Sequence, residues 1–313
     1  MTLAFIFPGQ GSQSVGMGQE LASAFSVAAQ VFEEVDAALG ENLSKLMFEG
    51  PEDTLRLTEN AQPALMAVSL AVMRVLESES GFDLQSNAMY VAGHSLGEYS
   101  ALAAAGTFSI SDAATLLRTR GRAMQEAVPV GDGAMAALLG LSLAVAAQVA
   151  EQASQGEICT AANDNADGQV VISGARAAVE RAIDIAKEHG AKRCVLLPVS
   201  APFHCALMAP AAEVMAEALA NVRMQQPAVP LIANVTATDV IDAAEIRRLL
   251  VEQVTGMVRW RESVLFMKHK DIEGLVEIGA GKVLCGLARR IDKDLETRHI
   301  GTPEEVEAFL ATL

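Results

Sequence analysis

The stretch Ala92-Gly93-His94-Ser95-Leu96-Gly97-Glu98 decides how this chain folds, because it has the Gly-x-Ser-x-Gly spacing of a nucleophile elbow. The apolar residues 88–92 predict a buried strand before it, and the Ala- and Leu-rich residues 96–105 predict a helix after it. Ser95 is therefore expected on a strained turn, with the free N–H groups of the helix facing any charge that develops beside it. The alternative is a buried structural serine in a tight turn.

The composition indicates a globular chain with a large core. The 313 residues are 51% hydrophobic and 20% charged, which is enough for one large core and a smaller lobe. A formal net charge of −16 argues against a general nucleic-acid binder and against an anionic membrane surface as partner, because both require positive potential. The four cysteines include no Cys-x-x-Cys pair, and the N-terminus lacks the features of a signal peptide. We therefore expect reduced thiols and a cytoplasmic location.

Strand and helix signals alternate along the rest of the chain. Residues 3–7 predict a short buried strand that leads into the glycine loop 8–13, a candidate anion-binding turn. Helical periodicity covers residues 18–39, and a second helix is predicted over residues 63–78, with Pro63 in its first turn. Further elements are predicted at residues 229–234 (strand), 243–254 (helix) and 274–278 (strand).

A helix predicted over residues 113–126 carries three arginines. Arg118 and Arg122 share one face of this helix, whereas Arg120 points elsewhere. Because arginine side chains mostly lie at the surface, the residues alone favour solvated charges at all three positions.

Residues 133–198 have the pattern of an inserted lobe. Their order of predicted elements is strand, helix, strand, strand, helix, strand, at residues 134–141, 142–154, 158–162, 170–173, 175–189 and 192–197. This βαββαβ order is typical of a ferredoxin-like fold. The turn-rich residues 163–168 predict a plain hairpin between the two middle strands. The apolar run 133–150 approaches the length of a membrane span, but a strand followed by a helix that Ser142 caps accounts for it.

A nucleophilic serine needs a base, which is most often histidine. His204 lies in a loop with two prolines after the inserted lobe, and His299 lies near the C-terminus, where an α/β-hydrolase usually keeps its base. The sequence context alone favours His204 as the base and leaves His299 as the alternative. We expect His94 to point away from Ser95, His189 to end a helix and His269 to lie in solvent.

Five strings of this sequence occur in the same order in one known family. They are residues 7–13 (FPGQGSQ), 93–102 (GHSLGEYSAL), 168–174 (GQVVISG), Phe203-His204, and Glu277-Ile278-Gly279 with residues 281–284 (GKVL). These strings resemble the malonyl-CoA:acyl carrier protein transacylases, and the match spans nearly the whole chain. The resemblance favours His204 over His299 as the base.

The resemblance also implies the fold class. It predicts an α/β protein, in which an α/β-hydrolase-like large domain with a central parallel sheet covers residues 1–128 and 199–313. A ferredoxin-like small domain is inserted at residues 129–198, and the active site is expected between the two domains.

By the same resemblance, Ser95 is the nucleophile and His204 the base. The main-chain carbonyl of Gln253 is expected to orient this histidine, so that no acidic third member is required. The main-chain N–H groups of Gln10 and Leu96 are expected to form the oxyanion hole.

Three further residues are expected to bind substrate. Arg120 would grip the carboxylate that distinguishes malonyl from acetyl, since a planar guanidinium can donate two parallel hydrogen bonds to it. Gln62 matches a glutamine of the acyl pocket, and Asn165 is expected among the substrate-binding residues. The resemblance implies no metal and no other cofactor, with malonyl-CoA and carrier-bound phosphopantetheine as substrates.

The implied function is a ping-pong transfer of malonyl from coenzyme A to acyl carrier protein, which supplies fatty acid biosynthesis. We expect a monomer that binds neither nucleic acid nor a membrane. Two alternatives use the same elbow. One is a serine hydrolase or thioesterase, which differs in whether water reaches the acyl-enzyme, and the other is a stand-alone acyltransferase of polyketide synthesis. A non-catalytic scaffold would have to explain why Ser95, His204 and Arg120 are all present.

Overall fold

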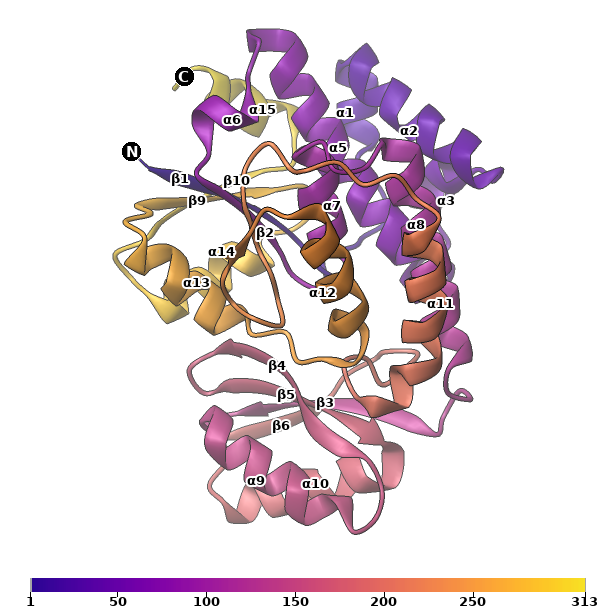
Figure 1. Ribbon diagram of the computed structural model, residues 1–313, viewed down its shortest axis with the longest axis vertical. Coiled ribbons are helices and arrows are strands. Elements are labelled where there is room, and N and C mark those ends of the chain that lie inside the picture. The colour runs from indigo at the N-terminus through magenta and orange to yellow at the C-terminus, as the bar shows by residue number, and fades with distance from the viewer. Residues whose placement is uncertain (1, 313) are drawn as a thin grey trace.

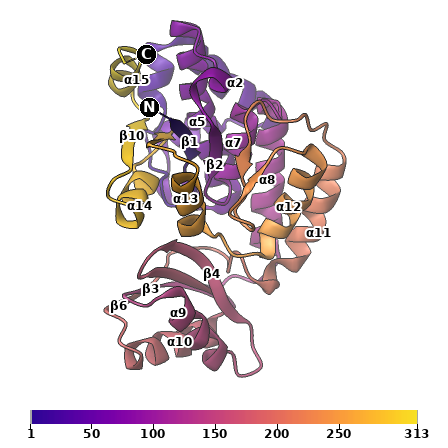
Figure 2. The same ribbon diagram turned by 60° about the vertical axis from the view of Figure 1, so that its left-hand side comes forward.

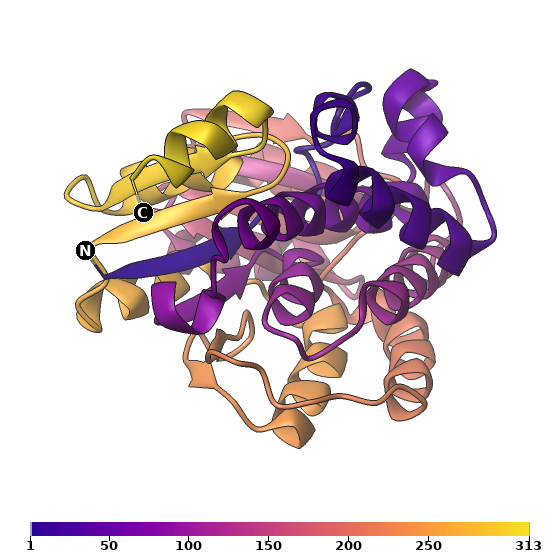
Figure 3. The same ribbon diagram turned by 90° about the horizontal axis from the view of Figure 1, so that it is seen from above.

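The computed structural model describes residues 2–312 and contains two separate β-sheets (Figure 1). The larger sheet has six strands in the order β10-β9-β1-β2-β7-β8, and the smaller sheet has four strands in the order β4-β5-β3-β6. The two ends of the chain lie on the same side of the larger body (Figures 1 and 3). A parallel-rich sheet with a separate small antiparallel sheet confirms the predicted α/β fold class.

The larger sheet is parallel except for its last strand. Its strands are β1 (Leu3–Phe7), β2 (Tyr90–Gly93), β7 (Leu231–Ile232), β9 (Gly274–Ile278) and β10 (Glu296–Ile300), followed by the antiparallel β8 (Asp239–Val240). Phe7 is paired with Gly93, so the loop after β1 and the elbow after β2 leave the sheet side by side. Strands β1 and β9 have the bounds that the sequence predicts.

Helices bury both faces of this sheet, which is why its strands are apolar throughout. Phe5 and Phe7 face one large cluster, whereas Ala4 and Ile6 face a second, smaller one. The large cluster includes residues of α1 (Gln19–Ala24), α2 (Ser26–Leu39), α3 (Leu43–Glu49), α4 (Glu52–Arg56), α5 (Thr58–Ser80), α6 (Leu84–Asn87), α7 (Gly97–Ala104), α8 (Ile110–Glu126), α11 (Ala209–Ala220), α12 (Ala243–Thr255) and α15 (Pro303–Leu310). The second cluster is covered by α13 (Trp260–His269) and α14 (Val283–Ile291).

The smaller sheet lies below the larger body together with its two helices (Figures 1 and 2). In chain order its elements are β3 (Gly133–Leu139), α9 (Leu143–Ser154), β4 (Cys159–Ala166), β5 (Gln169–Ala175), α10 (Arg176–Glu188) and β6 (Arg193–Leu196). This is the predicted βαββαβ order, all its strand pairs are antiparallel, and it has its own hydrophobic core. Ser142 caps α9 as predicted, and no helix of residues 2–312 is long and apolar enough to cross a membrane.

The predicted hairpin between the two middle strands is present, but its turn is shorter than residues 163–168. Strand β4 continues through Asn163 to Ala166, and only Asp167 and Gly168 form the turn. Strand β4 stays paired with β5 as far as Ala166, which lies opposite Gln169. In addition, Asp164 N–H donates to the Val258 carbonyl, and Val258 N–H donates to the Ala162 carbonyl. These bonds tie β4 to the segment before α13 and fix the small sheet against the larger body.

Several helix bounds also differ from the prediction. Helix α5 begins at Thr58, so Pro63 lies inside the helix instead of its first turn. The predicted helix over residues 18–39 is broken at Phe25, whose backbone is extended. Helix α8 begins at Ile110, because the Ser109 hydroxyl accepts the N–H of Asp112 and caps it. Strand β7 is limited to two residues, and the sequence did not reveal α13.

Two glycines test this packing. Gly286 lies exposed in α14, and a Cβ added to it would meet nothing within 4 Å. Gly286→Ala is expected to raise the free energy of unfolding by about 0.5–1 kcal/mol, because alanine loses less backbone entropy in a helix.

A Cβ on Gly93 would lie 1.9 Å from the backbone of Gly97, so Gly93→Ala is expected to disrupt the fold. Urea unfolding measures both, and a Gly93→Ala protein as stable as the parent would contradict the packing described.

Candidate active site

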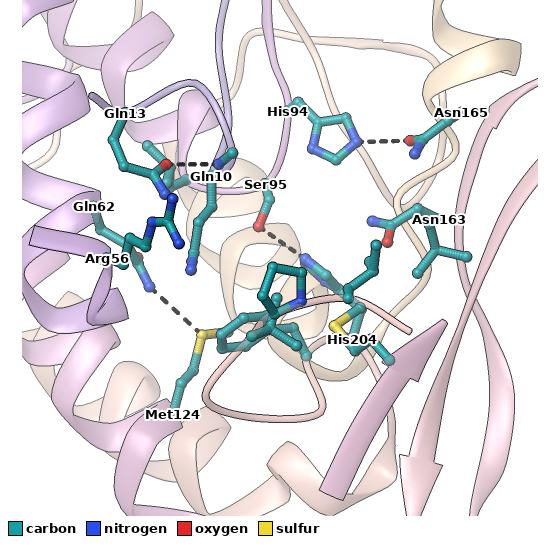
Figure 4. A pocket seen from close by; sticks show the side chains of 18 of the residues that line it. Gln10, Gln13, Arg56, Gln62, His94, Ser95, Met124, Asn163, Asn165 and His204 are labelled. Carbon is teal, nitrogen blue, oxygen red and sulfur yellow. Dashed lines mark hydrogen bonds between the residues drawn. The ribbon is translucent and has the colours of Figure 1, made fainter. Parts of the chain in front are cut away.

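A cavity of about 370 Å³ lies between the carboxyl end of the larger sheet and the smaller sheet (Figure 4). Ser95, Arg120 and His204 line it from the larger body, and Met135 and Val171 line it from the smaller sheet. The cavity thus lies where the sequence predicts the active site, between the two lobes.

Ser95 lines this cavity and has a left-handed backbone conformation, with φ of 55°. Strand β2 ends at Gly93 and α7 begins at Gly97, so the turn between them is as short as the motif predicts. Ser95 N–H donates to the Asn234 Oδ1 atom at 2.8 Å, and Asn234 Nδ2 donates to the Gly93 carbonyl at 2.7 Å. One side chain therefore holds both ends of the strained turn.

His204 lies beside Ser95, with its Nε2 atom 2.8 Å from the Ser95 Oγ atom (Figure 4). Its Nδ1 atom lies 2.9 Å from the carbonyl oxygen of Gln253 and 3.1 Å from that of Gly256. Carbonyl oxygens only accept hydrogen bonds, so Nδ1 carries the proton and Nε2 is free to accept the serine proton. The main chain thereby sets the tautomer that a general base requires.

The surroundings of His204 keep its ring neutral. The side chain is 3% exposed, and burial lowers the pKa of His204 to about 3, with the positive charge of Arg120 as the next cause. His299 lies elsewhere, where its Nε2 atom donates to the Gly279 carbonyl and its Nδ1 atom faces Glu305. His94 turns away from Ser95 to Asn165 at 2.9 Å, and His269 is exposed.

Arg120 is buried beside the serine, with 1% of its surface exposed. Its guanidinium donates to Gln62 Oε1 at 2.8 Å, to Gln253 Oε1 at 2.7 Å and to Ser95 Oγ at 3.2 Å. All three acceptors are neutral, and Arg120 Nε has no hydrogen-bond partner within residues 2–312. A buried cation whose contacts are neutral is suited to an anionic ligand.

The surface interpretation of the three arginines is correct only for Arg122, whose side chain is 51% exposed. Arg118 is 6% exposed and pairs with Glu41 at 2.9 Å. The error has a physical reason: α8 packs against α5, α11 and α2, so most of its surface is covered.

The remaining predicted residues lie at the cavity or directly behind it. Gln10 and Leu96 line it, and within the described residues the main-chain N–H of neither donates a hydrogen bond. Gln62 lines it next to Met124, and Asn165 reaches it from β4. Gln253 lies behind the cavity and is completely buried. Its side chain, for which the sequence suggested no role, contacts Arg120 and donates to the Ser95 carbonyl at 2.9 Å.

Two buried residues of the site were missed from the sequence. Asn234, which holds the elbow, lies in a loop with no motif to mark it. Glu98 is 1% exposed in the first turn of α7, where it accepts from Asn234 N–H and from Gln253 Nε2. The one available signal was a carboxylate directly after the elbow at the start of an apolar helix. No group of three or more His, Cys, Asp or Glu side chains in residues 2–312 could hold a metal ion.

An elbow serine, a neutral histidine held by main-chain carbonyls and two free N–H groups define a class of enzyme that works through an acyl-serine. The acyl transferase domain family matches residues 4–285 of this chain. The malonyl CoA-acyl carrier protein transacylase of Bacillus subtilis (strain 168) is 45% identical over 312 residues, which cover 99% of this chain and 97% of that relative. This chain belongs to the malonyl CoA-acyl carrier protein transacylase family.

Solved structures agree with this assignment. An acyl-carrier-protein-S-malonyltransferase from Bartonella henselae is 56% identical, with a TM-score of 0.97 over 100% of this chain and 99% of that one. A second structure, 42% identical with a TM-score of 0.96 over 100% of both chains, is a malonyl-transacylase in complex with a type II PKS acyl-carrier protein. The large parallel-rich sheet and the small antiparallel sheet are therefore the arrangement of this family.

The neutral His204 has a consequence for stability. The unfolded chain protonates this histidine below pH 6.5, whereas the native state does not until about pH 3, so the native state binds fewer protons in this window. The stability that His204 contributes is present above pH 6.5 and is lost as the pH falls. Between pH 7 and pH 5 this loss is about 2 kcal/mol. Urea unfolding at both values is expected to show a smaller loss for His204→Gln than for the parent, and equal losses would contradict a neutral buried ring.

Proposed function

We propose that this chain transfers a malonyl group from coenzyme A to the phosphopantetheine thiol of acyl carrier protein, and so supplies fatty acid biosynthesis. The observation that carries this proposal is the buried guanidinium of Arg120, 3.2 Å from the Ser95 hydroxyl that would hold the acyl group. The relatives named as malonyl transacylases and the neighbour solved with an acyl-carrier protein support it.

Acylation begins at Ser95. Its Oγ atom attacks the thioester carbonyl while His204 Nε2 takes the proton, and the two carbonyls at Nδ1 stabilise the imidazolium that forms. The N–H groups of Gln10 and Leu96 donate to the oxyanion, and the loss of one such donor typically costs about 3 kcal/mol of barrier. The C–S bond then breaks, and His204 returns its proton to the departing thiolate of coenzyme A.

The second half of the cycle reverses these steps. The phosphopantetheine thiol gives its proton to His204 and attacks the malonyl-serine ester, and Ser95 leaves as its hydroxyl. This chemistry needs no metal or other cofactor. We assign residues 129–198 to the small domain and 1–128 with 199–313 to the catalytic domain. We also propose that the enzyme works as a monomer and that it is located in the cytoplasm. The free thiols of its four cysteines support this location.

Arg120 selects malonyl by charge. The malonyl carboxylate can accept two parallel hydrogen bonds from the guanidinium, which Gln62 and Gln253 hold in place from the sides. An acetyl group would leave this buried cation without an ionic partner, and that difference disfavours acetyl transfer. Asn165 contributes through His94, whose ring it holds at the rim of the cavity.

Incubation of the enzyme with malonyl-CoA, without any carrier protein, distinguishes a transferase from a hydrolase. The parent enzyme is expected to release one equivalent of coenzyme A in a burst and to retain a malonyl adduct on Ser95, detected by intact-protein mass. Ser95→Ala is expected to show neither. Adding holo acyl carrier protein should then discharge the adduct to the carrier. Continuous release of coenzyme A without a carrier would instead indicate a hydrolase, and discharge only to a polyketide carrier would assign the enzyme to that synthesis.

Substitution of the buried arginine is expected to remove acyl selectivity. Arg120→Ala should lower kcat/KM for malonyl-CoA by about 100-fold or more, as expected when one partner of a buried charge pair is lost. Its kcat/KM for acetyl-CoA should fall much less. Arg122→Ala is the matched control, because Arg122 lies on the same helix but is half exposed. Steady-state rates with both acyl-CoAs measure the ratio, and equal losses with the two substrates would refute the assignment of Arg120.

A further inference from the structure

Glu98 is a buried carboxylate that the reaction described above does not use. It lies in the first turn of α7, three residues after the nucleophile, and its side chain is 1% exposed. Burial raises the pKa of Glu98, whereas the N–H donors of Asn234 and Gln253 and the charge of Arg120 act against this shift and stabilise the ionised carboxylate. A carboxylate kept in such a place is costly, so its contacts need an explanation.

One carboxylate oxygen of Glu98 reaches the elbow through Asn234. Oε1 accepts the main-chain N–H of Asn234, whose side chain in turn holds Ser95 N–H and the Gly93 carbonyl. Glu98 thereby fixes the position of the residue that braces the strained turn.

The other oxygen sets the orientation of the Gln253 side chain. Both groups that contact Glu98 are N–H donors, so Glu98 fits here as an ionised carboxylate, which only accepts. The NH₂ group of Gln253 therefore faces Glu98 Oε2, and it also donates to the Ser95 carbonyl. The amide oxygen then points the opposite way and accepts from Arg120 at 2.7 Å. With the amide reversed, an NH₂ group would face the guanidinium, and two donors would repel each other.

We propose that Glu98 is the positioning residue for malonyl selection: it orients the Gln253 amide, and this amide holds the guanidinium of Arg120 toward Ser95. The inference rests on the proposed function and names a residue through which that site acquires its specificity. Glu98 touches no reacting atom and acts through Gln253 and Asn234.

Glu98→Gln tests this role with almost no change of shape. A glutamine has one acceptor and one donor, so it cannot accept from both Asn234 N–H and Gln253 Nε2. The Asn234 N–H is fixed in the main chain, so the mismatch falls on Gln253 Nε2, and the Gln253 amide loses one of the two acceptors that orient it. We expect KM for malonyl-CoA to rise and the ratio of kcat/KM for malonyl-CoA to that for acetyl-CoA to fall by about 10-fold or more.

Glu277→Gln is the matched control. Glu277 is also a completely buried carboxylate that accepts two N–H groups, those of Leu284 and Cys285 at the start of α14. Its loss affects folding but not the cavity, so the ratio of kcat/KM for malonyl-CoA to that for acetyl-CoA should stay at the parent value. Rates are expressed per acylatable enzyme, taken from the burst of coenzyme A, so that unfolded protein does not count.

A double-mutant cycle shows whether Glu98 acts through the amide. Gln253→Met removes the amide and keeps the carbonyl that holds His204, and it should lower the malonyl preference by itself. Adding Glu98→Gln to it should then change the preference no further. If Glu98→Gln fails to fold, Gln253→Met alone decides, and a parent-like preference in that enzyme overturns the proposal.

The outcomes separate this inference from the proposed function. A parent enzyme that forms no malonyl adduct would defeat the proposed function itself. A parent that prefers malonyl, together with a folded Glu98→Gln enzyme of unchanged preference, would defeat only the role of Glu98. A fall in preference for Glu98→Gln but not for Glu277→Gln, absent in the Gln253→Met background, would establish it.

Discussion

The left-handed backbone of Ser95 is the constraint on which the rest of the site depends. A non-glycine residue with φ of 55° costs on the order of 1–3 kcal/mol, so the surrounding structure must hold it there. Three features do so: the close approach of Gly93 to Gly97, the Asn234 side chain that holds both ends of the turn, and the α7 helix that continues from it. In this conformation the Ser95 hydroxyl faces the cavity and contacts both His204 and Arg120.

A cation next to a general base shapes the electrostatics of the site. Arg120 and burial together disfavour a proton on His204, which keeps the ring neutral and ready to accept one. A malonyl carboxylate would offset the charge of Arg120 when it binds. Substrate binding therefore makes it easier for His204 to take the serine proton, whereas an acetyl group would leave the opposing charge in place. Selection of the acyl group and activation of the base are linked through one guanidinium.

The sequence predicted those parts of the fold and the site that depend on short-range patterns. The elbow, the βαββαβ order, and strands β1 and β9 follow from local spacing and apolar runs. Short-range patterns could not predict which residues contact one another, because these contacts join segments that are distant in sequence. Arg118 is buried because other helices pack around α8, and β4 extends beyond its predicted end because it continues to pair with β5 and also pairs with Val258. Asn234 and Glu98 are identified only by the groups they contact, 139 and 136 residues away respectively.

The use of a main-chain carbonyl in place of an aspartate beside His204 follows from the same geometry. The Gln253 carbonyl holds Nδ1, and the Gln253 side chain lies against Arg120, so an acidic residue at this position would pair with the guanidinium. Such a pair would compete with the carboxylate of the substrate and would weaken the discrimination against acetyl. A neutral amide can orient both the base and the cation without neutralising either. The carboxylate of Glu98, one amide farther away, keeps the buried charges in balance while leaving the face of Arg120 toward Ser95 available for the acyl group.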